Sequence, residues 1–530
     1  MVIFMLKGKS CYFVRLTALI LSLVLLNGML AGCKKSDGGD EYSTFTSEIW
    51  VDVDDTDGDG EDGNTDSEGG NTDSDGNGSH TEGGSKTQGG SSGTGTQSSG
   101  GSKDNNVKTE GKTFTIMSSY LPTSKSKAQY TFEKLFWQRV EEVEKEYGVT
   151  IKVIAGYPNT NNIASRIMAG KKIANILEAN CEDITGMASA GYIIPWDNVE
   201  GVNINNPNFW QGYTKAATLG SKHYGLQFEK PPELRFCIAV NKTLLKNNGI
   251  DANGIYTLVE KRQWNFAKFL EYAKKTTNTS AGTYGIGGPP AKISQMFIAA
   301  NGGKIVTIGS NGKANPTYTS KNVKNALDWM NNIVNNDKVY MTTSAMFEKG
   351  KADSAAPDYI QNFIDGKIAF LMDDSWVFNQ RIRPSIAKKG NKIEFGLLPV
   401  PLGPDAGNKS YSSLSSYARV FVITKTNNEH AFTAKILNAL AEYPSGYDAN
   451  SWQSEIAGDY FQSGDKQSLN MYLQLLNNME IDPGVGLPRV YSEFMDKAMY
   501  QTIFYGNGKT PGAAIDAIGT SYDKTIKALF

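Results

Sequence analysis

The sequence predicts an α/β fold for the part of the chain that follows Gly111, and three features indicate it. Short apolar runs typical of strands occur at 113–117, 149–155 and 176–177. Segments in which apolar residues recur at helical spacing, such as 163–169, separate these runs. The third feature is the change from a polar, glycine-rich composition before Gly111 to a mixed composition after it. Strands that alternate with helices predict a parallel sheet covered by helices on both faces.

The N-terminus has the features of a lipoprotein export signal. A basic stretch that ends at Arg15 precedes the apolar run 16–26, which is too short for a comfortable membrane span. The sequence Leu-Ala-Gly-Cys that ends at Cys33 resembles a bacterial lipobox. It predicts removal of residues 1–32 and lipidation of Cys33. The mature protein would then be held by lipid at the extracellular face of the cell membrane, as in a Gram-positive bacterium. A short anchor helix is the alternative.

Residues 33–110 comprise the lipidated cysteine and a linker that we expect to be disordered. They are mainly Gly, Ser, Thr, Asn and Asp, and so they cannot bury a core. The run 55–60 fits the first half of a calcium-binding loop, but its flanks are rich in glycine and serine instead of forming helices. A solvated spacer is therefore favoured over a calcium site.

The composition argues against several classes of function. The formal net charge is −2, and no stripe of Arg and Lys is interleaved with aromatic residues, so nucleic acid is not an expected partner. Cys181 and Cys237 are the cysteines left in the folded part, and they could form a disulfide or remain buried thiols. There is no CxxC pair and no HExxH motif, so we expect neither a metal site nor a cofactor.

The segment 363–376 offers the clearest candidate site. It reads as a helix end, a tight turn, an apolar strand, and then Asp373 and Asp374 before a helix that carries Trp376 in its first turn. Junctions of strand and helix bind ligands in α/β proteins. An aromatic ring beside carboxylates suits a polyhydroxylated ligand such as a sugar. The alternative is that an aspartate caps the helix and Trp376 packs in the core.

Several motifs between residues 190 and 440 occur in a characteristic order. They are AGYIIPWDN (190–198), YGLQF (224–228), IAVNKTLLKNNGI (238–250), QWNFAKFLEYAKKTT (263–277), FIDGKIAF (363–370), DSW (374–376), FGLLPVPLGPD (395–405) and the strand-then-helix segment 417–440. In this order they resemble the extracellular solute-binding lipoproteins of sugar-type ABC importers, the family of which maltose-binding protein is a relative. Trp196 stands where that family usually has leucine.

The resemblance implies a periplasmic-binding-protein-like fold of type II, in which two hinged α/β lobes enclose a ligand cleft. The solute-binding domain would span residues 111–530. Lobe one would take about 112–235 and 412–460, lobe two about 236–411 and 461–530, and the hinges would lie near 234–237 and 411–415.

The family's cleft contacts, carried over by position, imply a set of ligand-binding residues at strand ends, helix starts and the crossing between lobes. They are Tyr120, Asn180, Phe228, Glu233, Arg235, Asp374, Trp376 and Tyr417. For Glu233 and Arg235 the alternative is an ion pair between the lobes. Trp264 and Trp329 lie on amphipathic helices and are expected in the core, and packing is also favoured for Trp196.

The function implied is capture of a carbohydrate, an oligosaccharide, by a monomer that delivers it to the transmembrane subunits of an ABC permease. No enzymatic activity is expected. A surface glycan-capture or sensor protein without transport is one alternative, and a secreted glycoside hydrolase is another. Asp373 and Asp374 are adjacent, so they do not easily flank one scissile bond at a separation of roughly 5–10 Å. This fold also binds peptides, polyamines and metal chelates, so the ligand class remains open.

Overall fold

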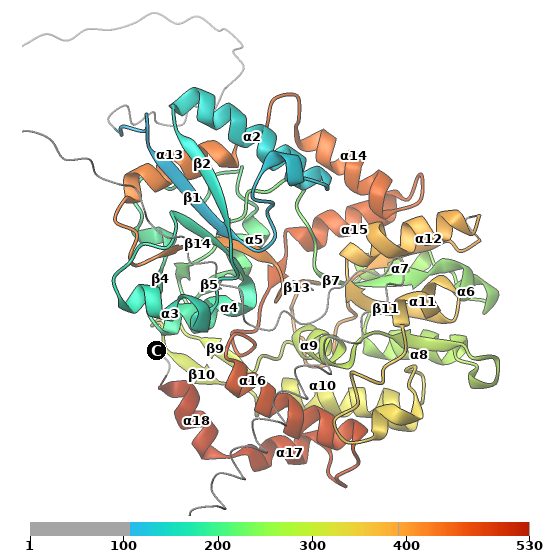
Figure 1. Cartoon of the computed structure of the whole chain (residues 1–530). Coiled ribbons are helices and arrows are strands. Elements are labelled where there is room, and N and C mark those ends of the chain that lie inside the picture. The colour runs from blue at the N-terminus through green and yellow to red at the C-terminus, as the bar shows by residue number, and fades with distance from the viewer. Residues whose placement is uncertain (1–106, 391, 529–530) are drawn as a thin grey trace, which may run out of the picture. The chain divides into compact units, whose positions relative to one another are not determined.

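The computed structural model describes residues 107–390 and 392–528. The export signal, Cys33 and the linker up to residue 106 lie outside the described residues. Two larger sheets organise the described part, and we use lobe one and lobe two for the elements packed on the first and the second of them (Figure 1).

The first sheet has the strand order β2-β1-β3-β14-β4. Its strands are β1 (Thr113–Ser118), β2 (Thr150–Ala155), β3 (Ile176–Asn180), β4 (Ile193–Ile194) and β14 (Arg419–Thr424). β1 pairs in parallel with β2 and β3, as the sequence predicts. β14 runs antiparallel to β3 and β4, so the expectation of a wholly parallel sheet is wrong. The reason is the route of the chain, because β14 enters this sheet from lobe two.

Helices cover the first sheet. They are α2 (Thr131–Tyr147), α3 (Thr160–Met168), α4 (Cys181–Ser189), α5 (Gln211–Ala216) and α13 (His430–Ala441). α13 comes from far along the chain and packs beside α2 (Figure 1). The rings of Phe114 and Phe432 meet edge to face at 5.9 Å between centroids, which joins strand β1 to helix α13. The core under these helices is therefore built from two distant parts of the sequence.

The second sheet has the strand order β12-β7-β11-β8. Its strands are β7 (Phe236–Asn241), β8 (Tyr284–Gly287), β11 (Ile368–Asp374) and β12 (Phe395–Leu398). The helices associated with it are α6 (Lys242–Asn247), α7 (Gly254–Glu260), α8 (Phe266–Thr276), α9 (Pro290–Ala300), α10 (Lys321–Asn331), α11 (Tyr359–Ile364), α12 (Arg383–Lys388) and α15 (Lys466–Leu476). Every residue of β7 and β11 is buried, because helices and neighbouring strands cover both faces.

The C-terminal part adds helices to lobe two. They are α14 (Ala449–Tyr460), α16 (Pro488–Met495), the π-helical segment η7 (Asp496–Phe504), α17 (Pro511–Ile518) and α18 (Thr520–Lys527). α17 packs on α10, and α14 packs on α15. The short strands form pairs of their own: β5 (Thr218–Leu219) with β6 (Lys222–His223), β9 (Val306–Ile308) with β10 (Ala314–Pro316), and β13 (Ser413–Leu414) with β15 (Met479–Glu480).

The chain passes between the lobes close to the two predicted hinges. The first crossing leads into β7 at Phe236, and the second contains β13. The hydroxyl of Ser413 donates a hydrogen bond of 3.0 Å to the carbonyl oxygen of Phe236, so the two crossings contact each other. A third crossing follows α13, and α14 after it contacts lobe two. The residue bounds of the lobes remain a prediction.

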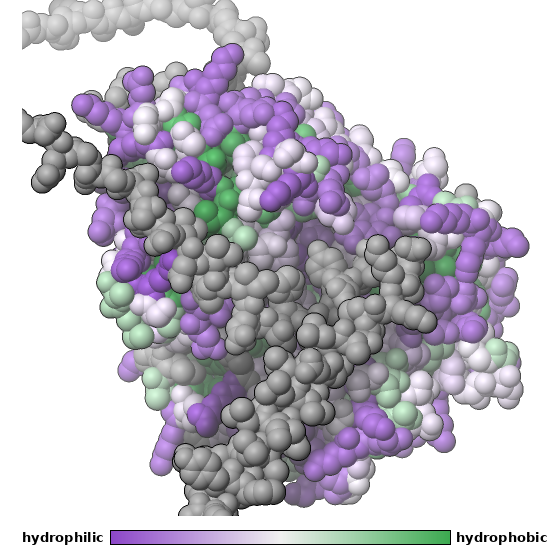
Figure 2. All heavy atoms as spheres, viewed as in Figure 1, coloured by the Kyte–Doolittle hydropathy of each residue, from purple (hydrophilic) through white to green (hydrophobic). Residues whose placement is uncertain are grey.

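Of the tryptophans assigned to the core, Trp264 and Trp196 are found there, and Trp329 is half-buried and packs against it. Trp264 and Trp196 are almost completely buried, and each indole donates to a backbone carbonyl oxygen. Trp329 stacks on Phe266 at 4.3 Å between ring centroids. Cys181 and Cys237 are buried free thiols, the second of the two possibilities. The face in Figure 2 is mainly hydrophilic where it is coloured, and the large hydrophobic side chains exposed among the described residues are Tyr130, Met168 and Phe347.

Candidate functional site

Polar side chains form a row where the strands of lobe one end. The Tyr120 hydroxyl, just after β1, donates to Asn180 Oδ1 at 3.2 Å. Asn180 Nδ2, at the end of β3, donates to the Tyr157 hydroxyl at 3.1 Å, and that hydroxyl donates to Asp183 Oδ2 at 2.6 Å. Because the carboxyl ends of parallel strands meet at one edge of a sheet, these residues lie together. The structure thus brings the predicted Tyr120 and Asn180 side by side.

Arg419 lies behind this row and was missed by the sequence reasoning. Its guanidinium sits 4.8 Å from the ring centroid of Tyr120 and 5.0 Å from that of Phe132. It also pairs with the buried carboxylates of Glu178 at 3.3 Å and Glu229 at 3.4 Å. A cation held between two rings and two acids fixes the position of Tyr120. The one signal in the sequence was an arginine at the start of an otherwise apolar strand.

The end of β11, in lobe two, carries the predicted ligand contact Asp374. Asp373 and Asp374 both pair with Lys292 of α9, at 2.5 and 2.7 Å. Burial works against the charge of Lys292, but the two carboxylates outweigh it and raise the lysine pKa. The aspartates therefore bind a lysine, and Asp373 Oδ1 also accepts a hydrogen bond of 2.8 Å from the backbone N–H of Asp374. Trp376 follows at the start of the next helical stretch and is half-buried.

Arg235 lies in the first crossing between the lobes, directly before β7. Arg235 pairs with Glu233 at 3.1 Å. The two residues thus form an ion pair within one crossing, and not the ion pair between lobes that was the alternative to ligand binding. Burial would lower the pKa of Arg235, but the charges of Glu233 and Asp374 raise it overall. Among the described residues, Arg235 Nε has no hydrogen-bond acceptor and Asp374 Oδ1 has no donor. Both atoms are buried, so water cannot take the place of the missing hydrogen-bond partner in this conformation.

The last two predicted residues differ in their surroundings. Tyr417 is half-buried and packs edge-on against Phe236 at 5.7 Å between centroids. Burial, followed by the charges of Glu182 and Asp374, raises its pKa, so its hydroxyl lies near acids of both lobes. Phe228 is 3% exposed and stacks on Phe421 at 4.5 Å in the core of lobe one. That packing leaves no face for a ligand, and we drop Phe228 from the proposed contacts.

Glu182 and Asp183, at the start of α4, are further acids that the sequence reasoning did not select. Burial and the charge of Asp183 raise the pKa of Glu182 to about 8, a hydrogen bond from Asn180 opposes the shift, and the charge of Asp374 adds to it. Burial raises the pKa of Asp183 to about 6, against the hydrogen bond from Tyr157. Asp374 belongs to lobe two, so the pKa of Glu182 depends on a charge of the other lobe.

These shifts predict how stability depends on pH. A carboxyl whose folded pKa exceeds its unfolded value binds protons more tightly when folded, so the free energy of unfolding falls as the pH rises between the two values. For Glu182 that window runs from 4.5 to about 8. We expect urea unfolding to show a decline across it and a shallower decline in Glu182→Gln. An equal slope in that variant would contradict the assignment.

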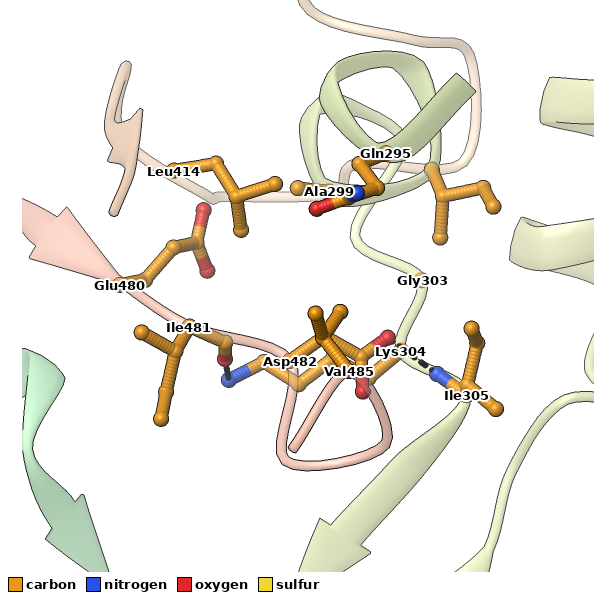
Figure 3. Close-up of a pocket in the computed structure, with 11 residues that line it drawn as sticks. Gln295, Ala299, Gly303, Lys304, Ile305, Leu414, Glu480, Ile481, Asp482 and Val485 are labelled. Atoms are coloured by element: carbon orange, nitrogen blue, oxygen red, sulfur yellow. Dashed lines mark hydrogen bonds between the residues drawn. The ribbon is translucent and has the colours of Figure 1, made fainter. Parts of the chain in front are cut away.

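Two cavities lie away from this site. One, of about 10 Å³, is bordered by α9, Leu414 of β13 and the segment 480–485, and has room for about one water molecule (Figure 3). Across it Lys304 Nζ donates to the carbonyl oxygen of Ile481 at 2.8 Å. The other, of about 320 Å³, is lined by residues such as Lys215, Lys409 and Ser412 and by no aromatic ring. None of the eight predicted residues lines either cavity, and neither offers a ring for a sugar to stack on.

Among residues 107–390 and 392–528, no helix is both long and apolar enough to cross a membrane. Within the same ranges, no three His, Cys, Asp or Glu side chains are grouped so that they could hold a metal ion.

Solved structures share this two-lobe architecture. The sugar-binding protein MalE from Xanthomonas citri is 14% identical, with a TM-score of 0.55 over 79% of this chain and 97% of its own. The GacH receptor of Streptomyces glaucescens is 16% identical, with a TM-score of 0.51 over 78% of this chain and 98% of its own. An ABC substrate-binding protein from Listeria monocytogenes is 18% identical, with a TM-score of 0.50 over 78% and 98%. These likenesses show a periplasmic-binding-protein-like fold.

The sequence itself identifies the family. Residues 138–446, more than half of the chain, match the family described as bacterial extracellular solute-binding protein. No curated protein matches the chain. The chain therefore belongs to the bacterial extracellular solute-binding proteins, in agreement with the motifs of its sequence.

Proposed function

We propose that the chain captures a carbohydrate, an oligosaccharide, between its lobes and delivers it chemically unchanged to the permease of an ABC transporter. The observation that carries the proposal is the pair of buried atoms without partners, Arg235 Nε and Asp374 Oδ1. One is a donor and the other an acceptor, which a sugar hydroxyl can satisfy in turn. Trp376 and Tyr417 are half-buried nearby and can cover the apolar face of a sugar ring.

The lobes supply the mechanism. A ligand that touches the row of Tyr120 and Asn180 in lobe one and Asp374 in lobe two stabilises the conformation in which the lobes are close. Without a ligand, that conformation leaves buried polar atoms unpaired, which costs free energy. Ligand binding and closure are thereby coupled, and a permease can distinguish the loaded form from the empty one.

The ligands of similar structures are consistent with a sugar. The GacH receptor was solved in complex with acarbose, and the Listeria monocytogenes protein in complex with cycloalternan. Since these proteins share little sequence with this chain, they support the ligand class and not the particular sugar.

A thermal-shift screen tests the proposal. The protein is incubated with mono- and oligosaccharides, amino acids, peptides and polyamines, and the ligand of any positive well is recovered and analysed. At 100 times its Kd a ligand stabilises the fold by about 2.7 kcal/mol, which is a shift of a few degrees. An oligosaccharide that shifts the Tm and is recovered intact is the expected result. Turnover of the sugar, or shifts with peptides or polyamines only, would contradict it.

Replacing Trp376 by alanine is expected to weaken sugar binding by about 1–3 kcal/mol, because a cleft aromatic contributes mainly to the complex. Calorimetric titration measures the loss, and urea unfolding checks the fold. Trp329→Ala is the matched control, because its half-buried ring contacts the rings of Phe266 and Phe297, and its loss should lower stability instead. If Trp376→Ala unfolds the protein as Trp329→Ala does, Trp376 is a core residue and the proposed site is wrong.

We also propose that lipid on Cys33 holds the protein, as a monomer, at the extracellular face of the membrane next to the permease. The support is the Leu-Ala-Gly-Cys sequence after an apolar run, which is outside the described residues. Cys33→Ser is expected to move the protein from the membrane fraction to the medium. Membrane association equal to that of the wild type would contradict lipidation.

A further inference from the structure

The charges of the candidate site do not balance. Each cation there is already shared among carboxylates: Arg419 pairs with Glu178 and Glu229, and Lys292 pairs with Asp373 and Asp374. Arg235 pairs with Glu233. Seven carboxylates, with Glu182 and Asp183 included, thus surround three cations.

Glu182 and Asp183 are the acids left without a cation. No ion pair found within residues 107–390 and 392–528 includes either of them. Their polar neighbours are neutral, Asn180 for Glu182 and the Tyr157 hydroxyl for Asp183. Carboxylates without a cation are costly to remove from water on closure unless a cation or a proton neutralises them.

A second observation comes from lobe two. The Asp374 side chain is 6% exposed, and its Oδ1 accepts no hydrogen bond from the described residues. Hydrogen bonds connect Asp374 to the segment that carries Glu182 and Asp183. The backbone N–H of Glu182 donates to the carbonyl oxygen of Ser416 at 2.8 Å, and the Ser416 hydroxyl donates to Gln295 Oε1 at 3.1 Å. Gln295 lies on α9, the helix whose Lys292 holds Asp374.

The hydrogen bonds of lobe one also leave acceptors available. The donor groups of Tyr120, Asn180 and Tyr157 already donate along the row. The hydrogen-bonding groups left without a partner at the site are therefore mainly acceptors.

We propose that the ligand of this cleft is an amino sugar, whose protonated amino group is received by Glu182 and Asp183. The inference rests on the proposed function and narrows its substrate class. With a neutral sugar, only protons could neutralise Glu182 and Asp183 in the closed form, whereas an ammonium group supplies three donors and a positive charge. The raised pKa of Glu182 has a further consequence: near neutral pH this acid holds a proton, which a bound ammonium group would displace.

The test uses ligands that differ only at carbon 2. The full chain is titrated calorimetrically at about pH 6.5 with glucosamine, glucose and N-acetylglucosamine, and with the β-1,4-linked trimers of each. Galactosamine with galactose and mannosamine with mannose extend the series. We expect at least one amino sugar to bind tenfold or more tightly than its hydroxyl and N-acetyl counterparts, and binding to release protons when two buffers of different ionisation enthalpy are compared.

Variants link the preference to the acid pair. Glu182→Gln and Asp183→Asn are expected to reduce the preference for the amine, while Glu200→Gln, an exposed acid on a turn, leaves it unchanged. Equal or tighter binding of the neutral or N-acetylated sugar would overturn the inference and leave carbohydrate capture standing. A preference that survives both acid variants would also overturn it. Binding of spermidine alone, or of no sugar in the series, would count against both proposals.

Discussion

Replacing Arg419 by methionine is expected to destabilise lobe one by about 3–5 kcal/mol, because removal of one partner leaves buried charges uncompensated. Arg419 is 8% exposed, and its guanidinium is the ion-pair partner of Glu178 and Glu229, which are themselves buried. Methionine keeps much of the volume between the rings of Tyr120 and Phe132 but removes the charge. Guanidinium chloride unfolding measures the loss.

Two comparisons separate the buried charge from a general effect of the substitution. Arg381→Met removes the exposed pair with Asp358, 3.8 Å long, and should cost no more than about 1 kcal/mol. Combining Arg419→Met with Glu178→Gln and Glu229→Gln should recover part of the loss, since the uncompensated carboxylates are then absent. A loss as small as that of Arg381→Met would refute the role given to Arg419.

Replacing Asp374 by alanine is expected to weaken ligand binding by about 2–5 kcal/mol, as truncation of a buried charged contact does. Folding should survive, because Lys292 keeps its pair with Asp373. Calorimetric titration with the sugar found by the screen should show the loss as a larger Kd.

Asp373→Ala is the matched control for this position. The two aspartates share Lys292, but Asp373 also accepts a hydrogen bond from the Asp374 backbone and is not one of the buried oxygens without a partner. Loss of the Asp373 side chain should lower the free energy of unfolding more than it lowers the affinity for the ligand. Equal losses of affinity in the two variants would mean that Lys292, and not a ligand contact of Asp374, governs binding.

The strands could be predicted because their signal is local. The runs at 113–117 and 149–155 correspond to β1 and β2, and polar segments flank each of them in the sequence. The direction of β14 could not be predicted in this way. It depends on the chain returning from lobe two, a property of the connection and not of the strand.

The assignment of the candidate site remains a prediction, and its basis is local in the same way. Asp374 and Trp376 follow a strand end, and strand ends are readable from the sequence. Lys292 and Arg419 were missed, because an ion pair depends on which helix start or strand faces the acid across about 80 or more residues of chain. Phe228 was misassigned, since its position near a crossing does not reveal that its ring turns inward onto Phe421.

Calorimetric titration of an oligosaccharide into the wild type, Asn180→Ala and Asp374→Ala tests the central claim most directly, because these residues belong to opposite lobes. We predict one sugar bound per chain, recovered intact, and weaker binding in both variants. Loss of affinity in only one of them would place the ligand on a single lobe. No binding of any sugar by the wild type would contradict carbohydrate capture itself.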